Sequence, residues 1–187
     1  GKLRTNLGVV PQDPILLSGS IRSNLDPHLQ HSDQRIWEVL NQVCLFDFVQ
    51  SRPGKLRCEI AEGGANISVG QRQLICFARA ILGNAKIILL DEATASVDQD
   101  TDAAIQTTIR SVFSDRTVIT VAHRLSTIMD YDRVIVLDKG QIAQFESPAE
   151  LLNQPGIFQS LVNESIASGV SLVGGPMRTC SPQSIKQ

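Results

Sequence analysis

Apolar positions in the middle of the chain alternate between two spacings, which predicts a strand–helix–strand order. Short aliphatic or β-branched runs predict strands at residues 7–10, 86–90 and 117–121. The continuous aliphatic run at 86–90 is typical of a strand that is covered on both faces. Apolar residues at helical spacing predict a helix that starts at Ser68 and ends at Gly83, and another helix over 101–113. Strands joined through helices pair in parallel, so this order predicts an α/β fold with a parallel sheet.

The segments around this core follow other patterns. Helical spacing over 21–53, then a polar loop over 54–64, predicts a helical subdomain that takes up about residues 21–82. Further along, a hairpin is expected around Asp138-Lys139-Gly140, followed by short helices at 148–152 and 156–162. We expect one domain over 1–164 and a flexible tail over 165–187, where Ser, Gly and Pro dominate.

Composition narrows the class of protein. The 187 residues are 42% hydrophobic and 19% charged, as in a globular domain, and the net charge of −2 argues against nucleic acid as a partner. No apolar run approaches the roughly 18 residues of a membrane span. The four scattered cysteines predict reduced thiols rather than disulfides or a zinc site.

The most informative polar residues follow the aliphatic strand at 86–90. Asp91 and Glu92 come at its carboxyl end, where open α/β sheets bind their ligands. One carboxylate can hold Mg²⁺ while its neighbour polarises an attacking water. The alternative is a helix-capping pair after a strand.

Three further features fall at comparable places. His123 follows the strand at 117–121 and can hydrogen-bond a terminal phosphate, or it can be a structural histidine. Ser68-Val69-Gly70-Gln71 begins a helix, where an anion is stabilised, or Ser68 is a simple N-cap. Gln12 follows the first strand and can coordinate Mg²⁺ or orient water, or it is an ordinary polar loop residue.

Taken in order, these motifs resemble the nucleotide-binding domain of ABC transporters, over about residues 3–162. Gln12 is similar to the Q-loop glutamine, and Ser68, Gly70 and Gln71 to the signature motif. The strand that ends in Asp91 resembles the Walker B strand, with Glu92 as the catalytic glutamate. Further matches are the D-loop at 95–98, with Asp98, and the switch histidine at His123. The Asn24-Leu25-Asp26-Pro27 segment resembles the second nucleotide-binding domain of C-subfamily multidrug resistance-associated exporters.

The resemblance implies a P-loop-NTPase-like fold that binds ATP and Mg²⁺. It implies three catalytic residues: Glu92 as the base for the attacking water, His123 at the γ-phosphate, and Gln12. Asp91 and Gln12 would be at the metal, and Gln12 would couple the metal to the helical subdomain. Ser68, Gly70 and Gln71 would serve the nucleotide of the transporter's first nucleotide-binding domain, paired head to tail, and Asp98 would cross that interface. The implied partners are that domain and the transmembrane domains, and the implied location is the cytoplasmic face of a membrane.

Two departures from the family pattern change these expectations. The phosphate-binding loop G-x-x-x-x-G-K-[ST] is absent, and Gly1 is followed almost at once by a predicted strand, so we expect an N-terminally truncated domain that hydrolyses little ATP by itself. Val69 replaces the glycine of the common signature motif, which adds a stiff, bulky side chain beside the expected phosphate contact.

Two other functions stay open at this point. One is a nucleotide-sensing regulatory domain, as in the channel regulators of the C subfamily. The other is an ATPase that acts on DNA or ribosomes, which the acidic charge balance disfavours. The transported substrate would be an organic anion, a conjugate or a drug if the exporter resemblance holds.

Overall fold

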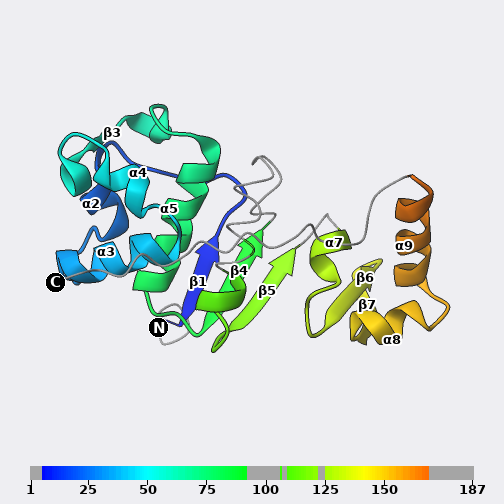
Figure 1. Ribbon diagram of the computed structural model, residues 1–187. Coiled ribbons are helices and arrows are strands. Elements are labelled where there is room, and N and C mark those ends of the chain that lie inside the picture. The colour runs from blue at the N-terminus through cyan, green and yellow to red at the C-terminus, as the bar shows by residue number, and fades with distance from the viewer. Residues whose placement is uncertain (1–5, 92–105, 107–108, 122–124, 169–187) are drawn as a thin grey trace. The chain divides into compact units, whose positions relative to one another are not determined.

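The computed structural model describes residues 6–91, 106, 109–121 and 125–168 (Figure 1). The chain divides into two compact units, and the boundary between them falls after Val121. Each unit has its own hydrophobic core, so the two are described separately.

A parallel three-stranded sheet forms the centre of the first unit. Its strand order is β1–β4–β5, and the strands are β1 (Leu7–Val10), β4 (Ile87–Asp91) and β5 (Thr117–Val121). Both pairings are parallel, with Val10 opposite Leu90 and Asp91 opposite Val121. The predicted α/β fold with a parallel sheet is therefore confirmed.

The two faces of this sheet differ in burial. Val10, Ile88 and Leu90 are at most 1% exposed and belong to the core. On the other face, Leu89 is half-buried and lies between Val9, 56% exposed, and Ile119, 50% exposed. In the described part of the chain, the strand expected at 86–90 is therefore fully buried on one face and half-buried on the other.

The segment expected to be helical over 21–53 consists of three helices, α2 (Ile21–Leu25), α3 (Asp33–Gln42) and α4 (Phe46–Gln50). Pro27 follows α2, and Leu29 and Cys44 have φ values of 53° and 58°, which an α-helix does not allow. Ser32 caps α3, since its hydroxyl accepts a hydrogen bond from the Arg35 N–H.

The segment expected to be a polar loop over 54–64 is ordered and partly buried. It contains η1 (Lys55–Arg57), β3 (Glu59–Ile60) and η2 (Glu62–Gly64), and β3 pairs with β2 (Gly19–Ser20). Leu56 and Ile60 are 6% and 2% exposed. The burial of Leu56 and Ile60 could not be predicted from the sequence, because isolated apolar residues in a polar segment show no periodicity.

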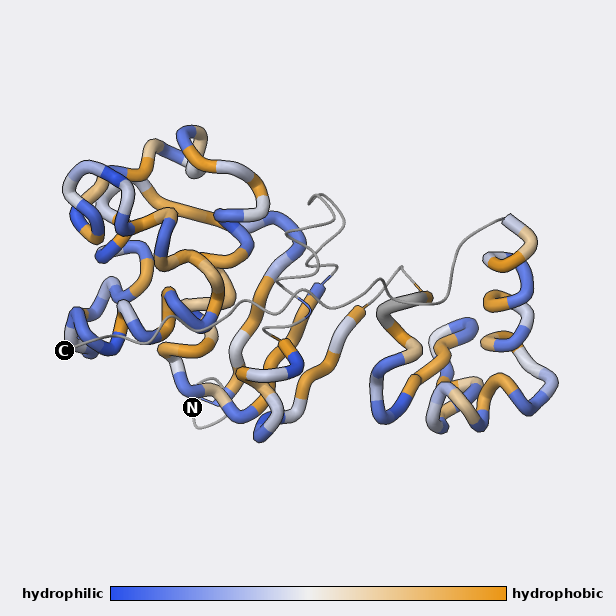
Figure 2. Tube along the Cα trace, viewed as in Figure 1, coloured by the Kyte–Doolittle hydropathy of each residue, from blue (hydrophilic) through white to orange (hydrophobic). Residues whose placement is uncertain are grey.

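Helix α5 (Val69–Leu82) packs against β1, α2 and α3 and supplies much of the first core. Apolar colour is concentrated along α5 and the sheet in Figure 2. Ser68 and Gly83 are its N-cap and C-cap, as the sequence predicts. Phe77 lies 6.3 Å from Phe113 between ring centroids. Of the helix expected over 101–113, residues 106 and 109–113 are described; residues 106 and 109–112 are helical, and Phe113 lies in a bend after the helix.

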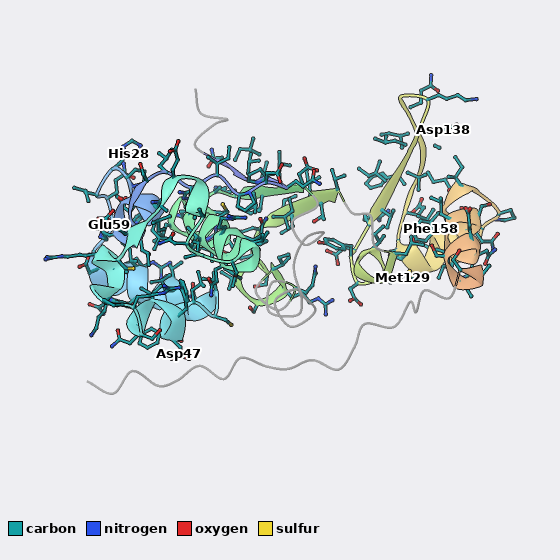
Figure 3. All side chains as sticks on the ribbon, turned by 90° about the horizontal axis from the view of Figure 1, so that it is seen from above. His28, Asp47, Glu59, Met129, Asp138 and Phe158 are labelled. Carbon is teal, nitrogen blue, oxygen red and sulfur yellow. The ribbon has the colours of Figure 1, made fainter. Side chains whose placement is uncertain are left out.

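The second unit is a hairpin covered by short helices. Its elements are α7 (Leu125–Ile128), β6 (Val134–Asp138), β7 (Gln141–Glu146), α8 (Pro148–Leu152) and α9 (Ile157–Ala167). The predicted hairpin is confirmed, with Lys139 and Gly140 at positive φ in its two-residue turn. Figure 3 shows Asp138 at the tip of the hairpin, away from Phe158 and Met129, which lie among the helices.

Helix α9 is longer than the predicted helix over 156–162. It runs through residues 165–167, which the sequence assigned to the flexible tail. Ser165 is compatible with a helix, and the Ser168 N–H donates to the Glu164 carbonyl at the end of α9. The predicted tail over 169–187 lies outside the described residues.

Candidate functional site

The carboxyl ends of β1, β4 and β5 meet at one edge of the sheet. The parallel register places Val10 beside Leu90, and Asp91 beside Val121. Asp91, the last residue of β4, is exposed, and Gln12 follows Val10 by two residues and is also exposed. The topology thus brings the Asp91 and Gln12 positions to the same edge, as expected of a ligand site in an open α/β sheet.

Three of the predicted site residues lie outside the described residues. Glu92 follows Asp91 directly, and His123 follows the end of β5 by two residues. Asp98 falls in the stretch 92–105. Glu92 and His123 are therefore close in sequence to strand ends that the register places side by side, and their roles stay predictions.

The Ser68–Gln71 motif occupies the N-terminus of α5. Ser68 has extended φ and ψ of −68° and 159°, and its hydroxyl accepts a hydrogen bond of 3.1 Å from the Gln71 N–H. The Gln71 side-chain oxygen accepts one of 3.0 Å from the Ser68 N–H. Gly70 is buried in the first turn. Ser68 is thus an N-cap, and a 14-residue helix directs its positive dipole end at this motif.

A comparison with protein-family models decides the family. The model described as ABC transporter matches residues 1–95, about half of the chain. The chain belongs to the ABC transporter family. The match spans the sequence from before Gln12 through Asp91 and Glu92, so it includes both the strand ends and the start of α5.

Curated relatives place this ABC transporter chain near the C subfamily. It is 53% identical over 163 residues to ATP-binding cassette sub-family C member 3 of Mus musculus, and equally to that protein of Homo sapiens. It is also 53% identical to sub-family C member 2 of Rattus norvegicus. Each alignment covers 87% of this chain and 11% of the relative, so the chain spans about a ninth of these proteins.

A solved structure supports the same fold. The chain is similar to a bacterial Atm1-family ABC exporter with ATP bound, with a TM-score of 0.81 and 34% sequence identity. The similarity covers 90% of this chain and 30% of the exporter chain. The expectation of an α/β core of the ABC ATPase type is thereby confirmed.

In this ABC transporter chain, the sequence analysis did not predict a role for three polar residues that hold the loop carrying Gln12. Asn24 and Gln73 are 6% and 1% exposed, and Arg79 is half-buried. Their hydrogen bonds connect α5 to the backbone on both sides of Gln12. The available signal was Gln73, directly before the apolar run that starts at Leu74, and Arg79 within that run, since buried polar groups need hydrogen-bond partners.

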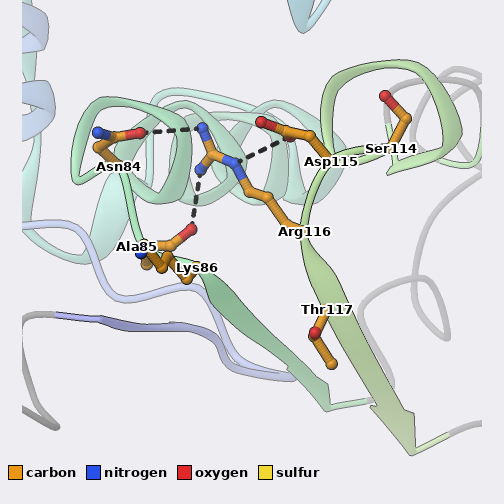
Figure 4. Close-up of a pocket in the computed structure, with 7 residues that line it drawn as sticks. All are labelled: Asn84, Ala85, Lys86, Ser114, Asp115, Arg116 and Thr117. Carbon is orange, nitrogen blue, oxygen red and sulfur yellow. Dashed lines mark hydrogen bonds and ion pairs between the residues drawn. The ribbon is translucent and has the colours of Figure 1, made fainter.

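A pocket of about 660 Å³ lies at the other end of the strands (Figure 4). Asn84, Ala85 and Lys86 precede β4, and residues 114–117 lead into β5. Arg116 donates to the Ala85 carbonyl and the Asn84 side chain and forms an ion pair with Asp115. Because these residues lie at the amino ends of the strands, this pocket is separate from the edge that holds Asp91.

The described residues contain no group of three or more His, Cys, Asp or Glu side chains that could hold a metal ion. Among oxygen donors at the sheet edge, the structure describes the Asp91 carboxylate and the Gln12 amide. A Mg²⁺ ion shared with nucleotide phosphates needs only one or two protein ligands, so this pair fits such an ion. In the described part of the chain, no helix is long and apolar enough to span a membrane.

Proposed function

We propose that this chain is part of the ATP-binding and ATP-hydrolysing domain of a C-subfamily exporter. The observation that carries the proposal is the shared edge of β1, β4 and β5, which brings the Gln12 and Asp91 positions together. The identity of 53% to sub-family C members supports it. The domain would work at the cytoplasmic face of a membrane and drive transport of organic anions, conjugates or drugs.

Each proposed role follows from side-chain chemistry at this edge. Asp91 and Gln12 offer oxygen ligands to Mg²⁺, which neutralises charge on the nucleotide phosphates when bound. Glu92 accepts the proton of the attacking water, and His123 donates a hydrogen bond to the γ-phosphate. Phosphoryl transfer depends mainly on positioning and charge stabilisation, so small displacements of these groups would slow it.

The second half of the proposal concerns the partner domain. Ser68, Gly70 and Gln71 would contact the nucleotide held by the first nucleotide-binding domain, and Asp98 would cross the interface. The reciprocal cap of Ser68 and Gln71 supports this role, because it fixes the start of α5 and its dipole. Val69 is half-buried, so its side chain partly fills the space that a glycine would leave open.

The assignment to the second nucleotide-binding domain rests on the Asn24–Pro27 segment, the Ser68–Gln71 variant of the signature motif and the Met129–Tyr131 segment, and the presence of Glu92 is consistent with it. In this subfamily the second domain usually keeps the catalytic glutamate and the first often lacks it. The residues Ala95–Gln99 and the Leu172–Pro176 tail resemble the seventh multidrug resistance-associated protein, and that narrower assignment stays a prediction.

The experiment uses the full-length protein that contains this chain, in inside-out membrane vesicles. Glu92→Gln should abolish ATP turnover and ATP-dependent uptake of a fluorescent organic anion, while ATP stays bound. Glu164→Gln makes the same chemical change at an exposed position on α9 and should leave both rates unaltered. A near-normal ATPase rate in Glu92→Gln would refute the catalytic role. ATP binding without hydrolysis-dependent uptake in the unaltered protein would favour the regulatory alternative.

A further inference from the structure

The segment that carries Gln12 is held on both sides by side chains of α5. Residues 11–18 have no regular secondary structure, and Gln12 lies in a bend within them. Its side chain is exposed, so its position depends on the backbone on either side. Hydrogen bonds from α5 reach the backbone at Pro11 and at Ile15.

The first attachment comes from Gln73. Its side-chain amide donates to the Pro11 carbonyl at 3.2 Å, across 62 residues of sequence. Gln73 is 1% exposed, so water cannot replace this hydrogen bond at little cost. The residue before Gln12 is therefore tied to the second turn of α5.

The second attachment comes from Arg79. One terminal guanidinium nitrogen donates to the Ile15 carbonyl at 2.7 Å. Its Nε and its other terminal nitrogen donate to the Asn24 carbonyl and side-chain oxygen at 2.6 and 2.8 Å. The planar guanidinium thus joins the loop to α2 with three charge-assisted hydrogen bonds.

Asn24 extends this attachment along the same loop. Its side-chain oxygen accepts from the Leu17 N–H at 3.0 Å, and its side-chain nitrogen donates to the Leu17 carbonyl at 2.8 Å. Asn24 is 6% exposed. The loop is therefore held at Pro11, Ile15 and Leu17, while Gln12 points to solvent between the held positions.

The spacing along the helix suits such a double attachment. Gln73 and Arg79 are six residues apart, about 9 Å along the axis of α5. Four residues of extended chain, as from Pro11 to Ile15, span at most about 14 Å. We propose that Gln73 and Arg79 are positioning residues that hold Gln12 in a fixed place relative to α5 and its Ser68–Gln71 motif.

This inference rests on the proposed function, in which Gln12 and the Ser68–Gln71 motif serve different nucleotides of a head-to-tail pair. A rigid connection between them means that a displacement of α5 at one nucleotide moves Gln12 at the other. Gln73 and Arg79 touch no nucleotide in this scheme, so we expect them to act on turnover through the position of Gln12.

The test uses full-length protein and a double-mutant cycle. Gln73→Met keeps the shape of the side chain and removes the amide donor. We expect kcat for ATP hydrolysis to fall about tenfold, with KM for ATP unchanged within about twofold. In a Gln12→Ala background, the same Gln73→Met change should cause no further loss of kcat.

A second pair of variants tests Arg79. Arg79→Lys keeps the positive charge but loses the planar guanidinium with its several donors, and it should lower kcat less than Arg79→Met.

Ile81→Val is the matched control, because Ile81 is a buried residue of α5, 3% exposed, and makes none of these hydrogen bonds. It should leave kcat near normal. An equal loss from Gln73→Met in both backgrounds, or an equal loss from Ile81→Val, would show a general effect on folding and overturn the positioning role. If Glu92→Gln abolishes turnover and Gln73→Met does not lower it, only the positioning role fails. If Glu92→Gln has no effect, the proposed function itself fails.

Discussion

Ser68 and Gln71 cap each other at the start of α5. The Ser68 hydroxyl accepts from the Gln71 N–H at 3.1 Å, and the Gln71 side chain accepts from the Ser68 N–H at 3.0 Å. This reciprocal pair satisfies two donors that the first turn of a helix leaves without intrahelical partners. The same two residues are those proposed to contact nucleotide, so their structural and functional roles must be separated by experiment.

Two substitutions at Ser68 separate these roles. Ser68→Ala removes the cap and should lower the free energy of unfolding of the nucleotide-binding domain by about 1 kcal/mol. Ser68→Asp keeps a good N-cap but places a carboxylate where phosphate is expected. It should retain the melting temperature and lose most ATP turnover. Thermal unfolding and ATPase assays check both results, and normal turnover in Ser68→Asp would contradict the nucleotide contact.

Neighbouring glycines before α5 provide a second prediction. Gly64 is buried at φ +73°, and a Cβ there would lie 2.6 Å from Cδ of Arg72 and 3.1 Å from Cδ1 of Leu16. Gly64→Ala should therefore destabilise the domain by about 2–3 kcal/mol through backbone strain and crowding. Gly63 has φ +64° with nothing within 4 Å of such a Cβ. Gly63→Ala should cost about 1 kcal/mol, and equal melting temperatures for the two variants would contradict the crowding.

The carboxylate of Asp26 makes the free energy of unfolding depend on pH in the acidic range. Burial acts to raise the pKa of Asp26, but the N–H groups of Gln30 and His31 and the Arg22 guanidinium outweigh it, so the pKa lies below its ordinary value of 3.8. A carboxylate whose pKa is lowered by folding stabilises the fold above its unfolded pKa, and loses that effect as pH falls through the folded pKa. Stability should therefore decline below about pH 4.

The Asp26→Asn variant tests this source of acid sensitivity. It should lower the free energy of unfolding at pH 7 by about 1.5–3 kcal/mol and flatten the dependence below pH 4. Asp33→Asn is a matched control, because Asp33 pairs with the same Arg22 but its side chain is 70% exposed. It should cost less than about 1 kcal/mol. Melting curves between pH 3 and pH 7 distinguish them, and an unchanged acid slope in Asp26→Asn would be contrary evidence.

Cysteine reactivity reports on the packing between α5 and the loop after Gln12. Burial raises the pKa of the Cys76 thiol, while Arg79 and the Ile15 backbone partly oppose that rise. Since the thiolate is the reactive form, the rate of modification by iodoacetamide at pH 8 should be at least about tenfold lower for Cys76 than for half-buried Cys58. Mass spectrometry after timed labelling measures both rates. Denaturation should equalise them, and equal rates in the folded domain would contradict the packing.

The sequence predicted the elements that have strong local patterns. The strand ending at Asp91, helix α5 between Ser68 and Gly83, and the hairpin around Gly140 all follow from periodicity, caps and turn residues. The breaks at Leu29 and Cys44 escaped prediction because non-glycine residues with positive φ give no composition signal.

The candidate site was predictable in part, for a comparable reason. Gln12 and Asp91 each follow a predicted parallel strand, and the carboxyl ends of parallel strands meet at one edge of a sheet, so the sequence favours a shared edge for these two residues. The strand order β1–β4–β5 has no such local signal. The contacts of Gln73 and Arg79 with Pro11 and Ile15 join residues more than 60 positions apart. Such pairs depend on tertiary packing, which a single sequence does not encode in any local pattern.

The uneven burial of the sheet has a practical consequence for handling this polypeptide. Val9, Leu89 and Ile119 form a continuous apolar row across three strands, and Val9 is 56% exposed to solvent. Exposed apolar surfaces of this kind associate in water and promote aggregation at high protein concentration. A preparation of these 187 residues alone is therefore expected to precipitate readily, and charged replacements such as Ile119→Lys should keep it dispersed.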